Sequence, residues 1–184
     1  LWTSPISFVA SANCALHCDA KIDFVDINLD TFNICPIKLE HKLKTTPKKK
    51  RPSILIVVHL AGLSCNMIKI KKLSLKYRFK IIEDASHAIG SKQKKVPVGS
   101  CKYSDLTVFS FHPVKIITTG EGGIVTTNQP RLCETLKLLR EHGIQKNQRK
   151  IMGKIDGPWF YQQQHLGFNF RMSDIHAVLG ISQI

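Results

Sequence analysis

Hydrophobic residues along this chain alternate between short, almost wholly apolar runs and segments with helical spacing. The apolar runs predict strands at residues 21–27, 53–59, 79–84, 106–111 and 123–127. The run at 53–59 is nearly free of polar residues, which is typical of a strand in a sheet that is covered on both faces. Because the last two runs are joined by a short connection, we expect the last strand to be antiparallel to its neighbour.

Amphipathic spacing predicts helices between these strands. They cover residues 8–16, 36–43, 66–77 and 130–142, and a final helix follows Ser173. Ser7 and Ser173 are the expected N-caps of the first and last helices, because serine accepts a hydrogen bond from the free amides of a first turn. In the third helix, Ile68, Leu73 and Leu75 are expected to face the core.

Strands and helices that alternate in this way predict an α/β fold with three layers, in which helices cover both faces of a mostly parallel sheet. Ligands of such sheets bind at the carboxyl ends of the strands. The 184 residues suffice for one domain with a substantial core, and residues 144–165 are predicted to form a polar loop. The chain begins at Leu1 and ends at Ile184 inside an uncapped helix, so we interpret it as a fragment of a longer protein.

Composition places the chain among ordinary globular proteins, with 43% hydrophobic residues. No apolar run is long enough to span a bilayer, and the first residues lack the pattern of a signal peptide. The six cysteines form no C-x-x-C pair and lie mostly in apolar segments, so we expect buried thiols in a reducing, cytoplasmic compartment. Cys14 and Cys18 could share a helix face, but no second ligand pair accompanies them, and no metal site is predicted.

The formal net charge is +14, which raises the question of a nucleic-acid partner. The basic residues form separate clusters at 48–51, 69–72 and 92–95, without interleaved aromatic residues or a nucleic-acid motif. We therefore interpret them as solvated faces and expect no nucleic-acid partner. A basic surface would also suit an anionic small substrate.

Lys115 is the residue that best indicates the chemistry of this chain. It follows the predicted strand at 106–111 and precedes the glycine-rich segment 120–123, whereas most other lysines lie in charged runs. A lysine held at a strand end among apolar residues can lose its proton more easily and act as a nucleophile.

Polar side chains also mark the ends of three successive predicted strands. His59 ends one, Asp84 ends the next with His87 three residues later, and Ser110 ends the third. If these strands are neighbours, the side chains gather around one crevice with Lys115. An imine-forming lysine needs an electrophilic carbonyl, which pyridoxal phosphate supplies. A carboxylate can keep the ring nitrogen of that cofactor protonated and a hydroxyl can hold its phosphate, so this set matches its needs.

Each of these residues also has a structural interpretation. Asp84 could cap the turn after its strand, His59 and His87 could be structural hydrogen-bonding histidines, and the glycines at 120–123 could simply form a turn. The glycine segment matches neither a phosphate loop nor a dinucleotide-binding pattern. The G-x-S-x-G elbow of a Ser-His-Asp hydrolase is absent.

Seven segments, in this order along the chain, resemble the DegT/DnrJ/EryC1/StrS family of sugar aminotransferases, which are fold-type I pyridoxal-phosphate enzymes. The segments are residues 4–10, 25–27, 58–62, 82–88, 110–115, 120–123 and 167–175. Together they cover nearly the whole chain and are specific, although no single one is. Within the family, segments 110–115 and 140–143 are most similar to the branch that acts in pseudaminic acid synthesis.

The resemblance implies a role for each candidate residue. Lys115 would form the imine with pyridoxal 5′-phosphate, Asp84 would pair with its pyridinium nitrogen, and His87 would lie beside the ring. Phe8 would stack on the ring face, and Ser110 would bind the phosphate.

Asn169 would reach the phosphate of the partner subunit, because the family builds each site across a homodimer interface. The implied reaction is transamination of a 4-keto-6-deoxy nucleotide sugar, UDP-linked, with L-glutamate as amino donor, in bacterial surface-sugar biosynthesis. Residues 1–184 would form an incomplete large domain, without the N-terminal Gly-Thr or Gly-Ser phosphate turn and the C-terminal small domain.

Two alternatives to a sugar aminotransferase stay open. A sugar dehydratase of the same fold carries histidine in place of the lysine, and Lys115 argues against it. An inactive truncated remnant, or a basic binding module, would retain the fold without the chemistry.

Overall fold

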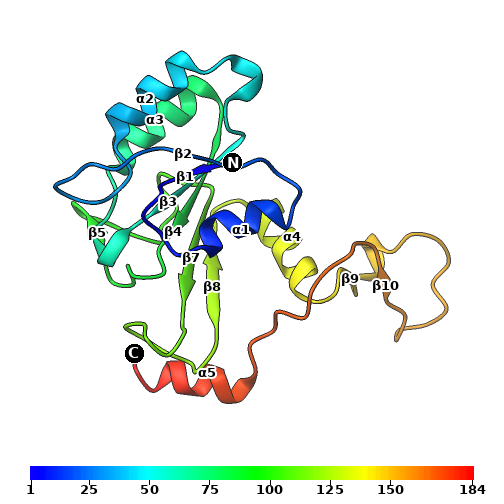
Figure 1. Ribbon diagram of the computed structural model, residues 1–184. Helices are drawn as coiled ribbons and strands as arrows, with labels where there is room; N and C mark the ends of the chain where they lie inside the picture. The colour runs from blue at the N-terminus through cyan, green and yellow to red at the C-terminus, as the bar shows by residue number, and fades with distance from the viewer.

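A computed structural model describes all 184 residues of the chain as a central sheet with helices around it (Figure 1). The sheet has six strands in the spatial order β2-β1-β3-β4-β7-β8. Their bounds are Trp2–Thr3 (β1), Asp23–Phe24 (β2), Ile54–Val58 (β3), Lys80–Asp84 (β4), Leu106–Ser110 (β7) and Gly123–Thr126 (β8). Every neighbouring pair is parallel except β7 and β8, which are antiparallel. The predicted α/β class and the antiparallel last strand are therefore confirmed.

Five α-helices and three short 3-10 helices connect these strands. The α-helices are Ala10–Leu16 (α1), Pro36–Thr45 (α2), Met67–Tyr77 (α3), Pro130–Arg140 (α4) and Asp174–Ile181 (α5), and the 3-10 helices are Lys48–Lys50 (η1), Leu60–Gly62 (η2) and Gln148–Lys150 (η3). Two small antiparallel pairs complete the structure. They are Lys92–Gln93 (β5) with Val96–Pro97 (β6), and Ile144–Gln145 (β9) with Gln162–Gln163 (β10). The second pair closes the predicted loop at 144–165, whose two-residue strands leave no apolar pattern in the sequence.

The two serines expected to cap helices behave differently. The hydroxyl of Ser173 accepts a hydrogen bond from the amide of His176 and caps α5, as predicted. Ser7 does not cap α1, because Val9 occupies the N-cap position and makes no side-chain cap bond. The Ser7 hydroxyl donates instead to the hydroxyl of Ser11, at 2.9 Å.

The main core lies between the sheet and helices α2 and α3. Its buried side chains include Trp2, Val25, Ile34, Leu39, Leu43, Leu55, Val57, Met67, Ile70, Leu73, Phe79 and Ile81. Leu73 faces this core as predicted and Ile68 is half-buried, but Leu75 is 70% exposed, so its prediction is wrong. The buried positions of α3 recur at intervals of three and four residues, and position 75 falls outside that face.

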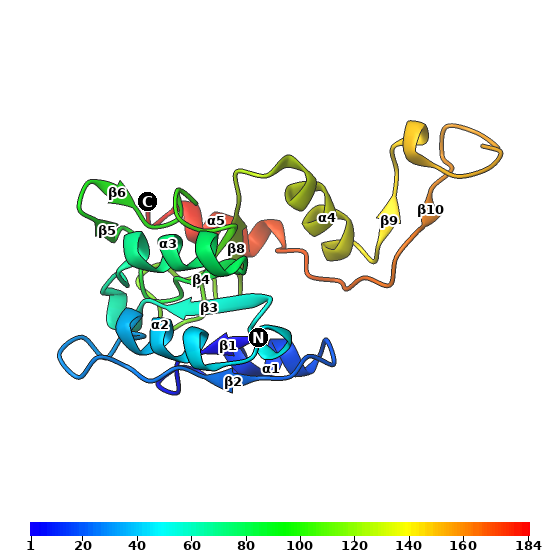
Figure 2. The same ribbon diagram turned by 90° about the horizontal axis from the view of Figure 1, so that it is seen from above.

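Helix α1 lies against the opposite face of the sheet from α2 and α3 (Figure 1). Ser11 and Ala15 of α1 are buried there. Helices thus cover both faces, as the three-layer prediction requires. Helix α4 has no buried residue, and the β9–β10 arm beyond it extends away from the sheet (Figure 2).

The cysteines are all free, but only half of them are buried. Cys35, Cys65 and Cys101 lie in the interior, Cys133 is half-buried, and Cys14 and Cys18 are exposed on α1 and just beyond it. The expectation of buried thiols is therefore wrong for the two cysteines near α1, because α1 turns that side outward. No helix in the structure combines the length and the apolar character needed to span a membrane.

Candidate functional site

Strands β3 and β4 end level with one another, and their neighbour β7 extends two residues further. Asp84, the last residue of β4, pairs with Val58 of β3 and with Val108 of β7. Ser110 lies two residues beyond Val108 and ends β7. Because side chains alternate between the faces of a sheet, Asp84 and Ser110 point to the same face. The three strands are therefore neighbours as expected, and two of the candidate side chains share the face covered by α1.

The carboxylate of Asp84 is held by three hydrogen bonds. Its Oδ1 accepts from the amide and the hydroxyl of Ser86, at 3.2 and 2.7 Å. Its Oδ2 accepts from the hydroxyl of Ser11 on α1, at 2.6 Å. One oxygen thus caps the turn after β4, which is the structural role considered for Asp84. The other oxygen faces the helix that covers this end of the sheet.

His87 is exposed, and the η2 turn holds its ring. Its Nδ1 accepts a hydrogen bond from the amide of Ala61, at 3.3 Å. The turn packs closely, since a Cβ added to Gly62 would lie 2.8 Å from the carbonyl oxygen of His87. A neutral imidazole that accepts at Nδ1 carries its proton at Nε2, so His87 can offer a hydrogen-bond donor to a ligand.

Lys115 lies on a loop that closes on the end of β7. The amide of Phe111 donates to the carbonyl of Gly122 at 2.8 Å, and the amide of Thr119 donates to the carbonyl of Phe111 at 3.0 Å. Gly123 is required by close packing, because a Cβ there would lie 2.8 Å from the carbonyl oxygen of Phe109. The glycine-rich segment therefore returns the chain to the sheet directly after the lysine-bearing loop.

The surroundings of Lys115 differ from the expected apolar setting. The lysine is half-buried and takes part in no ion pair with a carboxylate. Its neighbours Val114 and Ile116 are 78% and 69% exposed, so they do not shield it within this chain. The expectation that flanking apolar residues enclose Lys115 is wrong here, because the loop turns both side chains outward.

Helix α5 supports the lysine loop, a contact that the sequence did not indicate. The side chain of Gln183, just beyond α5, accepts from the amide of Thr118 at 3.0 Å and donates to its carbonyl at 2.6 Å. Gly180 of α5 packs tightly, since a Cβ there would lie 2.9 Å from Cγ2 of Thr119. Thr118 and Gln183 are 65 positions apart in the sequence, and no motif links them.

The remaining candidates are accessible to a ligand or a partner. Phe8 is 76% exposed and lies two residues before α1. The Ser110 hydroxyl oxygen accepts from the amide of His112 at 3.3 Å, which leaves its proton free to donate. Asn169 is exposed near the end of α4, where its Oδ1 accepts from Nε of Arg171 at 2.9 Å and its amide protons are free.

His59 belongs to a separate network on the other face of the sheet. Its Nε2 lies 2.8 Å from Oε2 of Glu83, and both side chains are buried. Its Nδ1 accepts from the amide of Cys65 at 3.1 Å, so the ring proton sits at Nε2 and is donated to Glu83. Ser104 and Thr107 donate to the other oxygen of Glu83. His59 therefore has the structural role considered for it and does not join Asp84.

The electrostatics of this buried network follow from its hydrogen bonds. Burial raises the pKa of Glu83, but the donors His59, Ser104 and Thr107 outweigh it and hold that pKa below its ordinary value. Burial, together with the charge of Glu83, raises the pKa of the Cys65 thiol to about 12. Glu83 is thus a buried carboxylate that joins the ends of β3 and β4 to the start of β7.

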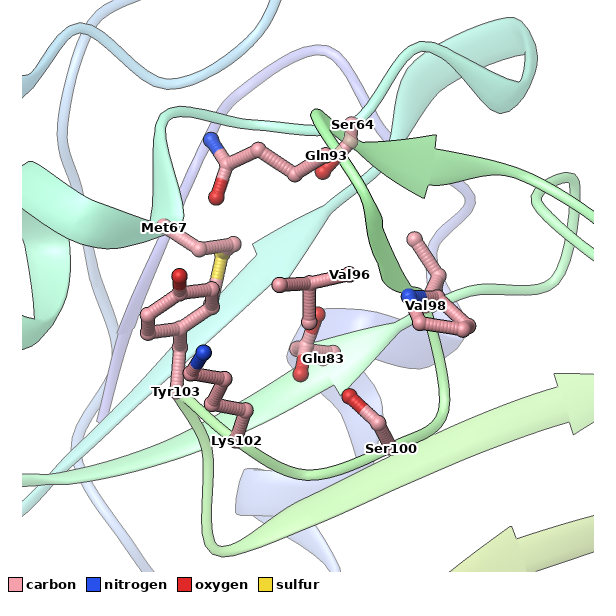
Figure 3. A pocket seen from close by; sticks show the side chains of 10 residues that line it. Ser64, Met67, Glu83, Gln93, Val96, Val98, Ser100, Lys102 and Tyr103 are labelled. Atoms are coloured by element: carbon pink, nitrogen blue, oxygen red, sulfur yellow. The ribbon is translucent and has the colours of Figure 1, made fainter.

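Two hollows of the molecule lie away from the strand-end residues. Figure 3 shows Glu83, Gln93 and Tyr103 around a cavity of about 10 Å³, which is room for about one water. A wider groove of about 400 Å³ lies between α4 and the β9–β10 arm. The positive charge of this groove is partly neutralised by ion pairs. Lys150 pairs with Glu134, and Arg140 and Lys146 both pair with Glu141. Neither hollow contains a residue of the predicted site.

The sheet order, the helices on both faces and the lysine loop after β7 are the features of the large domain of pyridoxal-phosphate aminotransferases. The chain belongs to the DegT/DnrJ/EryC1/StrS aminotransferase family, whose sequence model matches residues 1–184. The predicted resemblance is therefore confirmed.

Two curated relatives support the same family assignment. The chain is 42% identical over 182 residues to the UDP-4-amino-4,6-dideoxy-N-acetyl-beta-L-altrosamine transaminase of Campylobacter jejuni, covering 99% of this chain and 45% of that protein. It is 37% identical over 179 residues to the GDP-perosamine synthase of Caulobacter vibrioides, covering 97% of this chain and 43% of the relative. The chain thus spans about half the length of the curated relatives that it matches.

Solved structures share the fold. Helicobacter pylori PseC, an aminotransferase involved in the biosynthesis of pseudoaminic acid, is 36% identical with a TM-score of 0.84. The match covers 99% of this chain and 44% of that one. The PLP-form of the sugar aminotransferase Spr1654 from Streptococcus pneumoniae is 28% identical with a TM-score of 0.82, over 99% of this chain and 47% of that one.

Proposed function

We propose that this chain is part of a nucleotide-sugar aminotransferase that uses pyridoxal 5′-phosphate and has Lys115 as its catalytic residue. The observation that carries the proposal is the arrangement at the strand ends. Asp84 is fixed by three hydrogen bonds, Ser110 shares its face of the sheet, and Lys115 lies on the loop that follows β7. The family match over the whole chain supports the same chemistry.

The donor and acceptor groups of the site fit this cofactor. Asp84 offers a carboxylate to a protonated ring nitrogen, and the Ser110 hydroxyl has a free proton for a phosphate oxygen. His87 can donate from Nε2 beside the ring, and the exposed Phe8 can cover a ring face. When bound, pyridoxal phosphate supplies an electron sink for charge that develops at the α-carbon of an amino acid.

Lys115 has two tasks in this proposal. Its amine would hold the cofactor covalently, and once the amino donor has displaced it, the free amine would accept the proton from the donor's α-carbon and deliver it to the bound cofactor. Asp84 keeps the proton on the ring nitrogen throughout.

The proposed substrates are L-glutamate as amino donor and a UDP-linked 4-keto-6-deoxy sugar as acceptor, in bacterial surface-sugar biosynthesis. The names of the Campylobacter and Caulobacter relatives, a UDP-sugar transaminase and a GDP-perosamine synthase, support a nucleotide sugar. The similarity to PseC supports the pseudaminic acid branch. The net charge of +14 favours an anionic substrate of this kind.

We further propose a cytoplasmic homodimer in which residues 1–184 form part of the cofactor-binding large domain. The exposed apolar side chains of Phe168, Phe170, Ile175 and Ile181 support a contact with another protein surface. Asn169 lies among them, and its free amide protons suit the phosphate of a partner subunit's cofactor.

Borohydride reduction of the protein with pyridoxal phosphate tests the proposal directly. The protein, expressed from its complete reading frame, should gain one stable cofactor adduct, and peptide mass analysis should place it on Lys115. Lys115→Arg should lose both the adduct and turnover of UDP-keto sugar with glutamate, whereas Lys102→Arg, an exposed lysine beyond β6, should retain both. No adduct at all would favour the inactive remnant, and turnover retained by Lys115→Arg would refute the assignment.

A further inference from the structure

We propose that Ser11 is a positioning residue that orients the Asp84 carboxylate for its partner nitrogen, an inference that rests on the proposed function. The Ser11 hydroxyl donates to Oδ2 of Asp84 at 2.6 Å, across 73 residues of sequence. Ser11 is 5% exposed, so water does not compete for this bond. A short hydrogen bond to an ionised acceptor in a shielded place is stronger than one between neutral groups.

The hydrogen bonds of Asp84 leave one acceptor direction free. A carboxylate has about four lone-pair sites. The amide and hydroxyl of Ser86 use both on Oδ1, and Ser11 uses one on Oδ2. The remaining lone pair therefore belongs to Oδ2, the oxygen that Ser11 holds. Ser11 thereby fixes which oxygen of Asp84 faces the protonated ring nitrogen, and it fixes the orientation of the carboxylate plane.

A second hydroxyl strengthens this contact. Because the carboxylate of Asp84 can only accept, the single proton of Ser11 is directed to it. The Ser7 hydroxyl lies 2.9 Å from the Ser11 hydroxyl, to which it donates, and 3.2 Å from the carbonyl of Phe8, its other acceptor. Hydrogen bonds arranged in series polarise one another, which makes the final donor more effective. The amide of Ser11 also donates to the carbonyl of Phe8 at 3.1 Å. One short segment thus controls both the carboxylate and the aromatic ring proposed to contact the cofactor.

The test is the affinity of the apo-protein, expressed from its complete reading frame, for pyridoxal phosphate, measured by absorbance titration. Ser11→Ala should bind about ten-fold more weakly, because it loses a hydrogen bond to a charged group. Ser74→Ala is the matched control, since Ser74 is also 5% exposed in a helix and donates to the carbonyl of Phe79. The control should lower the melting temperature without weakening binding. Unchanged affinity in Ser11→Ala would overturn the proposal.

A double-mutant cycle separates positioning from general packing. If Ser11 acts through Asp84, the Ser11→Ala substitution should change affinity less than about two-fold when Asp84 is already alanine. A full ten-fold effect in that background would overturn the role of Ser11 and leave the proposed function standing. Affinity that is unaffected by Asp84→Ala, or absent in the wild-type protein, would overturn the proposed function itself.

Discussion

The side-chain amide of Gln183 pairs with both backbone groups of Thr118, accepting from its N–H and donating to its C=O. Thr118 lies three residues after Lys115, so helix α5 holds the lysine-bearing loop from outside the sheet. A single side chain thereby replaces the partner that a neighbouring strand would give to this part of the backbone.

Gln183→Ala should loosen this loop without unfolding the domain. The substitution removes both hydrogen bonds to Thr118, each of which contributes about 1 kcal/mol, and a third to the carbonyl of Leu179. Amide hydrogen exchange at Thr118 should accelerate, because its N–H loses its acceptor. Gln164→Ala is the control, since that side chain donates to Lys150 on the β9–β10 arm and should leave exchange at Thr118 unchanged. Unaltered protection of Thr118 in Gln183→Ala would contradict the assignment.

Leu39 and Leu75 should differ sharply in their contribution to stability. Leu39 is fully buried between α2 and the sheet, and its replacement by alanine should cost about 3 kcal/mol. Leu75→Ala should cost less than about 0.5 kcal/mol, because that side chain is 70% exposed. Urea denaturation of both variants measures the difference. Equal losses would mean that α3 is rotated relative to the sheet.

Removing the charge of Glu83 should destabilise the protein in a pH-dependent way. Glu83→Gln should lose about 2 kcal/mol at pH 7, because hydrogen bonds to a buried carboxylate are lost or weakened. The pKa of Glu83 is held below its ordinary value of 4.5, so this stabilisation is complete above 4.5 and declines as the pH falls through the lower folded value.

Unfolding free energies of the wild-type protein and Glu83→Gln between pH 7 and 3 measure this effect. The gap between the two proteins should narrow towards acid pH. Glu40→Gln removes an exposed carboxylate that pairs with Lys44 and Lys76, and it should have little effect at any pH. If the difference in unfolding free energy stays constant down to pH 3, the charge of Glu83 is not the source of the stabilisation.

The cysteines should react with iodoacetamide at very different rates. Cys18 is exposed and should react first. Cys14 is also exposed, but partial desolvation of its thiol raises its pKa, so it should follow. The pKa of about 12 leaves Cys65 with about one thiolate in ten thousand molecules at pH 8, so it should react last. Time-resolved peptide mass analysis at pH 8 gives the order. Early modification of Cys65 in the folded protein would contradict it.

Much of the sheet was predictable because a covered strand must be apolar. Ile54–Val58 reads as such a strand in the sequence and forms one. Asp23–Phe24 covers only part of the predicted run at 21–27, and Trp2–Thr3 was not predicted, because two residues carry no periodic signal. Ser7 resembles Ser173 as a cap in sequence, but a local contact with Ser11, four residues later, uses its hydroxyl instead.

The strand-end residues of the candidate site were predictable for a similar reason. Parallel strands end at one edge, so Asp84 and Ser110 could be placed together before their register was known. Ser11 and Gln183 were missed because each contacts the site across more than sixty residues and belongs to no motif. The separation of His59 from Asp84 depends on which face each side chain takes, and that is fixed only by the register.

Glu83 and Asp84 are adjacent acids whose side chains lie on opposite faces of β4. A register slip of one residue would move every side chain of this strand to the other face. It would place the longer glutamate beneath Ser11 and leave the shorter aspartate opposite His59, so that both networks would break together. A single-residue insertion or deletion in β4 should therefore be among the least tolerated changes in this gene, even where it preserves the strand's apolar character.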